Sequence, residues 1–293
     1  MERELKRKKT FDEQIDLLKN RNLIIDNEKQ AKYILSKVNY YRLSGYFKYF
    51  YQSENRFKEG TSFDDIYNIY KFDTELRRLI MSLTEEVEIS FRTYVAYYIA
   101  HNFGEEGYLD SSKFNEKYHD KFIDNIKEKI NSYKEKEFIK HHNKQYNGKL
   151  PIWVIVEIFS FNDLSRLYGN MSNKDRKNII RNNYDNIDIV GSAFDVHNWI
   201  RILCDVRNIC AHYERLFNRR LTNSFKLPRK YNKVFSNTLF SVLIVLKLLI
   251  NNEIIWDDFL DKFYNLLDKY NFSDFEALGF TNDWKLILES KKD

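Results

Sequence analysis

Apolar side chains recur at helical spacing along most of the chain, and polar side chains fill the positions between them. From residue 73 to about residue 103 the apolar positions fall every three or four residues, which predicts one long amphipathic core helix. The opposite face of this helix is charged, and we expect most of these charges to be solvated or paired. Arg92 lies on that face and is a candidate to reach a functional site.

Capping residues predict where several other helices begin. Thr10 and Glu13 have the form of a capping box, in which each side chain accepts a hydrogen bond from the other residue's backbone amide. Ser62 is followed by acidic residues, which suit the positive end of a helix dipole. Ser172 and Ser192 each precede an aspartate by three positions. We expect Ser192 to open the helix that carries the candidate chemistry.

Residues 150–168 have the pattern of one apolar helix that starts near Pro151, a residue suited to the first helical turn. We interpret Glu157 as the single acid of the apolar first part of this segment, residues 150–161. A buried carboxylate must be paired or protonated, so we expect Glu157 to meet a basic residue, with Arg201 and Arg207 as candidates. Such a pair ties helices together, and it is equally compatible with orienting a catalytic arginine.

One strongly apolar helix carries a single polar stripe. Arg201, Asp205, Asn208 and His212 follow one another at four, three and four positions, so they share one helical face. Burying polar groups without partners costs about 1–3 kcal/mol each, so the stripe either finds partners in this chain or lines a wet cleft. Arg207 precedes His212 by five residues, about 140° around the axis, so the two side chains flank a surface.

Residues 39–51 are the densest aromatic stretch of the chain, and they are interleaved with basic residues. Aromatic faces beside cations can stack bases and hold phosphates, which makes Arg42, Tyr41 and Tyr46 candidate RNA contacts. Aromatic runs more often pack into a core, and there Gly45 would allow close approach of the backbone. Both interpretations stay open at this point.

The composition predicts an all-α protein. Only two prolines and eight glycines occur in 293 residues, so few residues interrupt a helix. The net charge of +5 permits an RNA partner without demonstrating one. Cys204 and Cys210 have neither zinc-ligand spacing nor the pattern of a disulfide framework. We therefore expect a reducing, cytoplasmic setting, with no metal site and no cofactor.

No segment has the pattern of a signal peptide or a membrane span. Residues 1–4 are charged rather than apolar, unlike the core of a signal peptide. Residues 239–250 are the most apolar run and contain Lys247, and a spanning helix needs about 20 apolar residues. We interpret this run as a core helix and expect no membrane partner.

We expect three parts along the chain. Residues 1–60 would form an N-terminal helical hairpin with the aromatic segment, for which DNA binding by a helix-turn-helix is only weakly supported. Residues 61–270 would form a helical domain, with an exposed helical insertion at about residues 110–149. Residues 271–293 would form a C-terminal tail that frays beyond Trp284.

Three stretches taken together resemble the AbiD/AbiF-type abortive infection (Abi) proteins, which are bacterial phage-resistance factors. They are residues 41–47 (Tyr-Arg-Leu-Ser-Gly-Tyr-Phe), residues 153–168, and residues 207–219, which begin Arg-Asn-Ile-Cys-Ala-His. The resemblance covers most of the chain, from about residue 9 to residue 269. This family is similar to the HEPN superfamily, helical domains whose Arg-x4–6-His motif forms a metal-independent ribonuclease site, usually by pairing two copies.

The resemblance implies a HEPN-like helical bundle with an N-terminal helical extension. It also implies that Arg207 and His212 are the catalytic pair and that Asn208 is the polar residue after the arginine. Departures from the family pattern are Asn162, Tyr213 and Phe217, where relatives often have glycine, a second histidine and tryptophan. We expect the remaining site residues to support the pair or to contact RNA: Glu157, Asp205 and Arg201 as supports, and Arg215 and Arg219, with Arg42, Tyr41 and Tyr46, as RNA contacts.

These residue types suit RNA cleavage, because RNA carries its own nucleophile in the 2′-hydroxyl. Histidine can transfer protons near neutral pH, and arginine can stabilise the extra negative charge of a phosphorane. A C2 homodimer would bring two copies of His212 to one cleft and give 2′,3′-cyclic phosphate and 5′-hydroxyl ends. A neutralising small RNA or antitoxin is a plausible further partner, as in a toxin–antitoxin system.

Two other functions compete with this hypothesis. A non-catalytic module of the same defence system would bind RNA or protein through the aromatic and basic surface, with His212 in a structural role. A helical DNA-binding regulator would bind duplex DNA with a steep dependence on salt.

Overall fold

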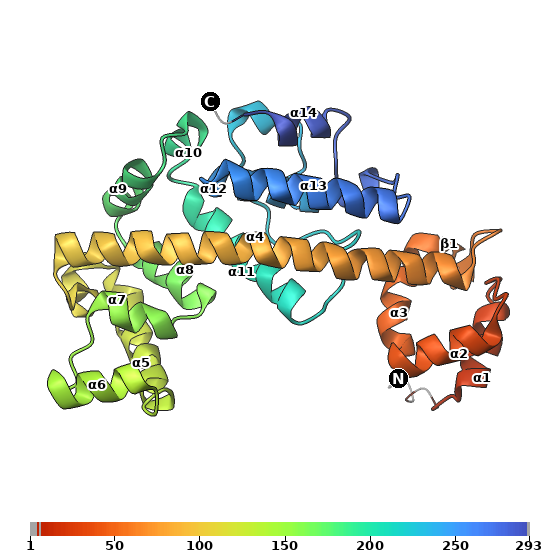
Figure 1. The fold of residues 1–293 in the computed structure, drawn as a ribbon, viewed down its shortest axis with the longest axis horizontal. Helices are drawn as coiled ribbons and strands as arrows, with labels where there is room; N and C mark the ends of the chain where they lie inside the picture. Colours follow the sequence, from red (N-terminus) through yellow and green to blue (C-terminus); the bar gives the residue numbers. More distant parts are fainter. Residues whose placement is uncertain (1–4, 6, 292–293) are drawn as a thin grey trace.

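The computed structural model describes residue 5 and residues 7–291, and this part of the chain is almost entirely helical (Figure 1). Within it lie fourteen α-helices, six short 3₁₀ helices and one two-stranded hairpin, made of β1 (Tyr51–Ser53) and β2 (Arg56–Phe57). The predicted all-α class is confirmed, and the scarcity of proline and glycine is its physical reason. The charged residues 1–4 lie outside the described residues.

Helix α4 (Phe63–Phe103) runs through the length of the molecule, and the other helices pack along it (Figure 1). Its 41 residues extend about 60 Å at 1.5 Å per residue. The predicted core helix is confirmed, although it starts ten residues earlier than the apolar pattern indicated. The reason is local, because Ser62 and Asp65 form a capping box just before the first turn.

The N-terminal helices pack at one end of α4 (Figure 1). Helix α1 (Phe11–Lys19) begins at the capping box of Thr10 and Glu13, as predicted. Helix α2 (Glu28–Lys37) follows, and α3 (Tyr40–Phe47) with the 3₁₀ helix η1 (Lys48–Phe50) contains most of the aromatic stretch. The aromatic residues of α3 therefore lie on one short helix against α4.

The opposite end of α4 leads through η2 (Gly107–Leu109) and η3 (Ser111–Lys113) into the predicted insertion. The insertion contains α5 (Glu116–Ser132) and α6 (Glu137–Gln145), and α5 packs against α8 (Phe161–Asn170). Buried apolar side chains from α1 to α14 join one core. The domain boundaries at residues 60 and 270 stay a prediction.

The predicted single helix over residues 150–168 is wrong. The structure has α7 (Ile152–Ile155), then η4 (Val156–Ile158), and then α8 (Phe161–Asn170). The break lies at Ser160, whose extended backbone and side chain cap α8 in a reciprocal pair with Asp163. Asp163 also pairs with Lys129 of α5, and these partners lower the pKa of its carboxyl despite burial.

The central helix also starts later than predicted. Ser192 is the C-cap of α10 (Ile187–Gly191), and α11 (Val196–Ala211) begins after Asp195. The preceding α9 (Asn173–Asn183) does start at Ser172, as predicted. Helix α11 packs against both α4 and α8, which places the end of α11 near the middle of the molecule (Figure 1).

The C-terminal helices cover the remaining side of α4 (Figure 1). Helix α12 (Leu239–Leu249) is buried along its whole length, which confirms the predicted core helix, and α13 (Glu253–Lys269) packs against α4. None of the described helices combines the length and apolarity needed to cross a membrane. The remaining 3₁₀ helices are η5 (Arg229–Tyr231) and η6 (Glu276–Leu278).

The predicted fraying of the chain beyond Trp284 is wrong. Residues Trp284–Glu289 form α14, which packs against α12. Trp284 and Leu288 are buried, and the indole nitrogen of Trp256 donates a hydrogen bond to the Leu288 carbonyl at 2.9 Å. Burial of these apolar groups holds the segment to the core despite its lysine-rich end.

Candidate functional site

The polar stripe of α11 faces solvent. Arg201, Asp205, Asn208 and His212 are all exposed, whereas most other residues of the helix are buried. The apolar faces of α11 pack on α4 and α8, so the stripe is the face that these contacts leave open. The stripe is therefore in contact with solvent and is not buried against other parts of this chain.

His212 is the C-cap residue of α11, and the chain turns sharply after it. Tyr213 has a φ of 58°, in the left-handed region that usually favours glycine or asparagine. The amide of Tyr213 donates to the Cys210 carbonyl at 3.1 Å, and the amide of Glu214 donates to the Ile209 carbonyl at 2.9 Å. This pair of bonds is a Schellman motif, which fixes the backbone at His212.

Helix α3 holds this turn from the side. The guanidinium of Arg42 donates a hydrogen bond to the carbonyl of Tyr213, which is the residue directly after His212. Arg215 lies over α3 at Gly45, where a Cβ atom would be 4.0 Å from Cδ of Arg215, an ordinary van der Waals distance. Tyr41, on the same helix, is 86% exposed. The first and third stretches of the family resemblance are therefore in contact.

A buried carboxylate anchors the loop that follows the turn. Asp73 of α4 accepts hydrogen bonds from the amide of Phe217 at 2.7 Å and from the amide of Leu216 at 3.2 Å. The Tyr46 hydroxyl donates to the same carboxylate at 2.6 Å, and Arg77 forms a salt bridge with it at 2.5 Å. Burial raises the pKa of the Asp73 carboxyl, whereas Arg77 and the hydrogen-bond donors act in the opposite direction.

This cluster corrects one expectation from the sequence and shows the partner of a charged residue of α4. Tyr46 is only 2% exposed and its hydroxyl is used inside the protein, so it is not available as an RNA contact. Arg77 is one of the charges on this helix, which we expected to be solvated or paired, and it is buried and paired with Asp73. The spacing of Asp73 and Arg77, four residues apart within an apolar helix, is the signal that could have revealed the pair.

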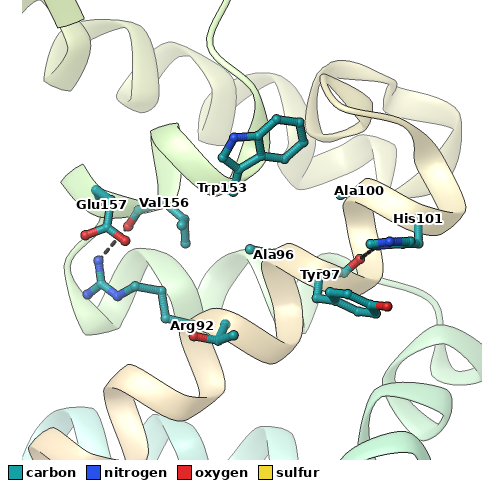
Figure 2. Close-up of a pocket in the computed structure, with 9 residues that line it drawn as sticks. Arg92, Ala96, Tyr97, Ala100, His101, Trp153, Val156 and Glu157 are labelled. Atoms are coloured by element: carbon teal, nitrogen blue, oxygen red, sulfur yellow. Dashed lines mark hydrogen bonds between the residues drawn. The ribbon is translucent and has the colours of Figure 1, made fainter. Parts of the chain in front are cut away.

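Arg207 is held by a carboxylate that the sequence did not point to. Its side chain is 35% exposed, and its Nε lies 3.9 Å from Oε2 of Glu88 on α4. Glu88 also forms a salt bridge with Arg92 at 2.8 Å, and Arg92 donates a hydrogen bond to the Val156 carbonyl at 2.5 Å (Figure 2). These contacts connect the second stretch of the resemblance to Arg207 through α4.

The expectation that Glu157 is buried and pairs with Arg201 or Arg207 is wrong. Glu157 is exposed on η4, before the break at Ser160, and it lies beside Arg92 (Figure 2). Glu88, rather than Glu157, is the carboxylate beside Arg207.

The remaining candidates surround the end of α11. Arg215 and Arg219 are partly exposed, and Arg219 forms a salt bridge with Glu214 at 2.7 Å. Burial raises the pKa of the Cys204 and Cys210 thiols to about 12, so neither is a nucleophile at neutral pH. Among the described residues, no group of three or more His, Cys, Asp or Glu side chains is placed to hold a metal ion.

Of the three residues that depart from the family pattern, one is buried in the core and two are exposed. Phe217 is fully buried, with its ring centroid 4.9 Å from that of Tyr49 in an edge-to-face contact. Asn162 is exposed in the first turn of α8, and Tyr213 is exposed at the turn after α11. None of the three lies within the segment from Arg207 to His212.

Comparison with known protein families gives one match. A family model described as Abi-like protein matches residues 33–218, which is more than half of the chain. The matched range runs from α2 to the loop after α11, and it contains the Asp73 cluster, Glu88 and the Arg207–His212 segment. No curated protein and no solved structure matches the chain significantly.

Proposed function

The chain belongs to the Abi-like protein family, and we propose that it is a metal-independent endoribonuclease of the HEPN type, acting in bacterial anti-phage abortive infection. Family membership by itself suggests the role in abortive infection. The observation that supports catalysis is the end of α11, where His212 is exposed at the C-cap and half-buried Arg207 lies 3.9 Å from Glu88 of α4. Arg42 of α3 holds the backbone at Tyr213, directly after His212.

In the proposed reaction the 2′-oxygen of RNA attacks the adjacent phosphorus, and the bond from phosphorus to the 5′-oxygen breaks. The imidazole of His212 takes the 2′-proton or delivers a proton to the leaving 5′-oxygen. Arg207 stabilises the added negative charge on the phosphorane, with its orientation supported by Glu88 and by Asn208, whose Oδ1 lies 3.4 Å from Nη1 of Arg207. The products are a 2′,3′-cyclic phosphate and a 5′-hydroxyl.

The proposed site contains one histidine per chain, whereas this reaction uses both a base and an acid. We therefore propose that two copies form a C2 dimer in which the exposed stripe of one α11 approaches the other. Each His212 would then serve in one of the two roles. Arg42, Tyr41, Arg215 and Arg219 are the proposed contacts to RNA around this site, in the cytoplasm, and a small RNA or antitoxin would restrain it.

The test uses wild-type protein and two variants, His212→Ala and His141→Ala, incubated with total cellular RNA in EDTA. His141 is a matched control, because it is an exposed histidine on α6, far along the chain from the proposed site. We expect wild type and His141→Ala to produce new ends with cyclic phosphates, and His212→Ala to produce none. RNA with 2′-O-methyl groups and single-stranded DNA should resist, since both lack the nucleophile.

Two results would contradict the proposal. Cleavage that survives in His212→Ala would remove the proposed site. Absence of cleavage by a folded wild type that still binds RNA would favour the non-catalytic binding module instead.

A further inference from the structure

A pocket of about 340 Å³ opens between α4 and α7, beside the contacts that hold Arg207 (Figure 2). Trp153 of α7 faces α4 across the opening, and Ala96 and Ala100 lie on the α4 side of it (Figure 2). Arg92 and Glu157 lie toward one end of the pocket (Figure 2). Tyr97 and His101 lie toward the other end, with stacked rings whose centroids are 3.9 Å apart.

Trp153 is in an unusual environment for this protein. The other three tryptophans, Trp199, Trp256 and Trp284, are 0%, 4% and 6% exposed, whereas Trp153 is 51% exposed. An exposed tryptophan at the mouth of a pocket leaves a large apolar face in water, which burial under a ligand would relieve. Small side chains on the α4 side keep the space in front of the indole open, because a larger residue at position 96 or 100 would fill it.

We propose that this pocket binds one base of single-stranded RNA, stacked on the indole of Trp153. The inference rests on the proposed function, because it places the base next to the phosphate that would be cut. The volume is at the lower end of small-molecule sites, which suits a single nucleobase better than a helix or a peptide segment. Aromatic side chains beside cations are the usual means of holding single-stranded nucleic acid.

The position of the pocket supports this occupant. Arg92 lines the pocket and pairs with Glu88, which in turn lies next to Arg207. An RNA strand with its base on Trp153 would therefore run past Arg92 toward Arg207. The side chain of Arg92 is 16% exposed and paired with Glu88, whereas that of Arg207 is 35% exposed and can meet a phosphate.

The test measures binding of fluorescently labelled oligoadenylate RNA by anisotropy, with the full chain carrying His212→Ala so that the probe is not cut. On this background, Trp153→Ala should raise Kd by about 5- to 150-fold, the range found when one stacking aromatic is removed. Trp153→Phe should keep most of the affinity, and Trp153→Leu should lose it, because leucine is apolar but has no aromatic face. Tyr33→Ala, which removes an aromatic side chain that is 64% exposed on α2, is the matched control and should bind as the parent does.

A second probe separates base stacking from phosphate binding. An abasic oligonucleotide of the same length should bind Trp153→Ala and its parent equally. The inference is overturned if Trp153→Ala changes Kd for oligoadenylate less than twofold, or if Trp153→Leu binds as the parent does. It is also overturned if Trp153→Ala weakens binding of the abasic probe as much as it weakens binding of oligoadenylate. It is also overturned if Trp153→Ala converts a dimer to a monomer in sedimentation, since the pocket would then belong to a second copy.

The outcomes distinguish this inference from the proposed function. Binding is measured without cleavage, so base stacking on Trp153 in a protein that never cuts RNA would contradict only the ribonuclease proposal. Cleavage by wild type with no contribution of Trp153 to base binding would contradict only the pocket.

Discussion

The carboxylate of Asp73 accepts a hydrogen bond of 2.7 Å from the backbone amide of Phe217, a residue 144 positions later in the chain. This bond joins the central helix α4 to the loop that follows the proposed catalytic helix. The same carboxylate receives the hydroxyl of Tyr46 and the guanidinium of Arg77, so one buried group fixes α3, α4 and the loop together.

We expect Asp73→Asn to destabilise the protein by about 3–5 kcal/mol, because it leaves the charge of Arg77 buried without a counterion. Urea unfolding followed by circular dichroism would measure the loss. Asp258→Asn is the control, since Asp258 pairs with Lys262 on the surface, where both side chains are more than half exposed. That exposed pair should contribute less than about 1 kcal/mol. Equal effects of the two substitutions would show that the buried cluster is not an anchor.

Glu88→Gln should slow RNA cleavage by about 10- to 100-fold, because a neutral amide no longer holds the Arg207 guanidinium in place. A positioning role predicts that kcat falls while KM changes little, and that Glu88→Asp recovers part of the rate. Glu86→Gln serves as the control, since Glu86 is exposed on the same helix. If Glu88→Gln cleaves as fast as Glu86→Gln, Arg207 does not depend on this contact.

The two cysteines should be unreactive in the folded protein. Cys204 and Cys210 are 3% and 5% exposed, and burial raises the pKa of each thiol to about 12. A thiol reagent such as DTNB should therefore modify neither until urea unfolds the chain. A Ser132→Cys variant introduces an exposed thiol on α5 and should react at once in the native state. Fast labelling of native wild type would mean that the end of α11 opens readily.

The stability of the protein should fall as the pH drops through the region of histidine titration, in part because of His197. Burial, then Arg176 and Arg201, lower the pKa of this imidazole below its usual 6.5. The unfolded chain therefore takes up a proton near pH 6.5, whereas the folded protein does so only at lower pH, so unfolding is favoured below that value.

Comparing urea unfolding of wild type and His197→Gln at several pH values would test this linkage. The variant should show a shallower loss of stability between about pH 7 and pH 5, since it lacks the group that titrates there. A steeper slope in the variant would contradict the direction of the pKa shift. The slope is the informative readout, because the ring of His197 also packs against Gly169 and its removal changes stability at every pH.

Several elements of the fold were predictable because they depend on neighbouring residues. The starts of α1 and α9 follow from Thr10 and Ser172, and the buried helix α12 follows from its unbroken apolar run. The family resemblance, carried by residues 41–47, 153–168 and 207–219, agrees with the Abi-like match. Arg207 and His212 could also be selected from the sequence, but their catalytic role stays a prediction.

Predictions failed where residues distant in the sequence compete for the same group. The apolar pattern of residues 150–168 fits one helix, yet the chain breaks at Ser160, which caps α8 in a reciprocal pair with Asp163. Lys129, 34 residues earlier in the chain, pairs with the same carboxylate. Tyr46 was a candidate RNA contact, but its hydroxyl donates a hydrogen bond to the carboxylate of Asp73, 27 residues away in the chain.

The sequence by itself determined the all-α class, the long central helix and the polar stripe of α11, because helical periodicity and capping are local properties. Only the tertiary structure decided that the stripe is exposed, that Glu88 rather than Glu157 holds Arg207, and that Trp153 stands over an open pocket. These features depend on which helices pack against each other. Periodicity records that a face is apolar or polar, but it does not record which partner that face will meet.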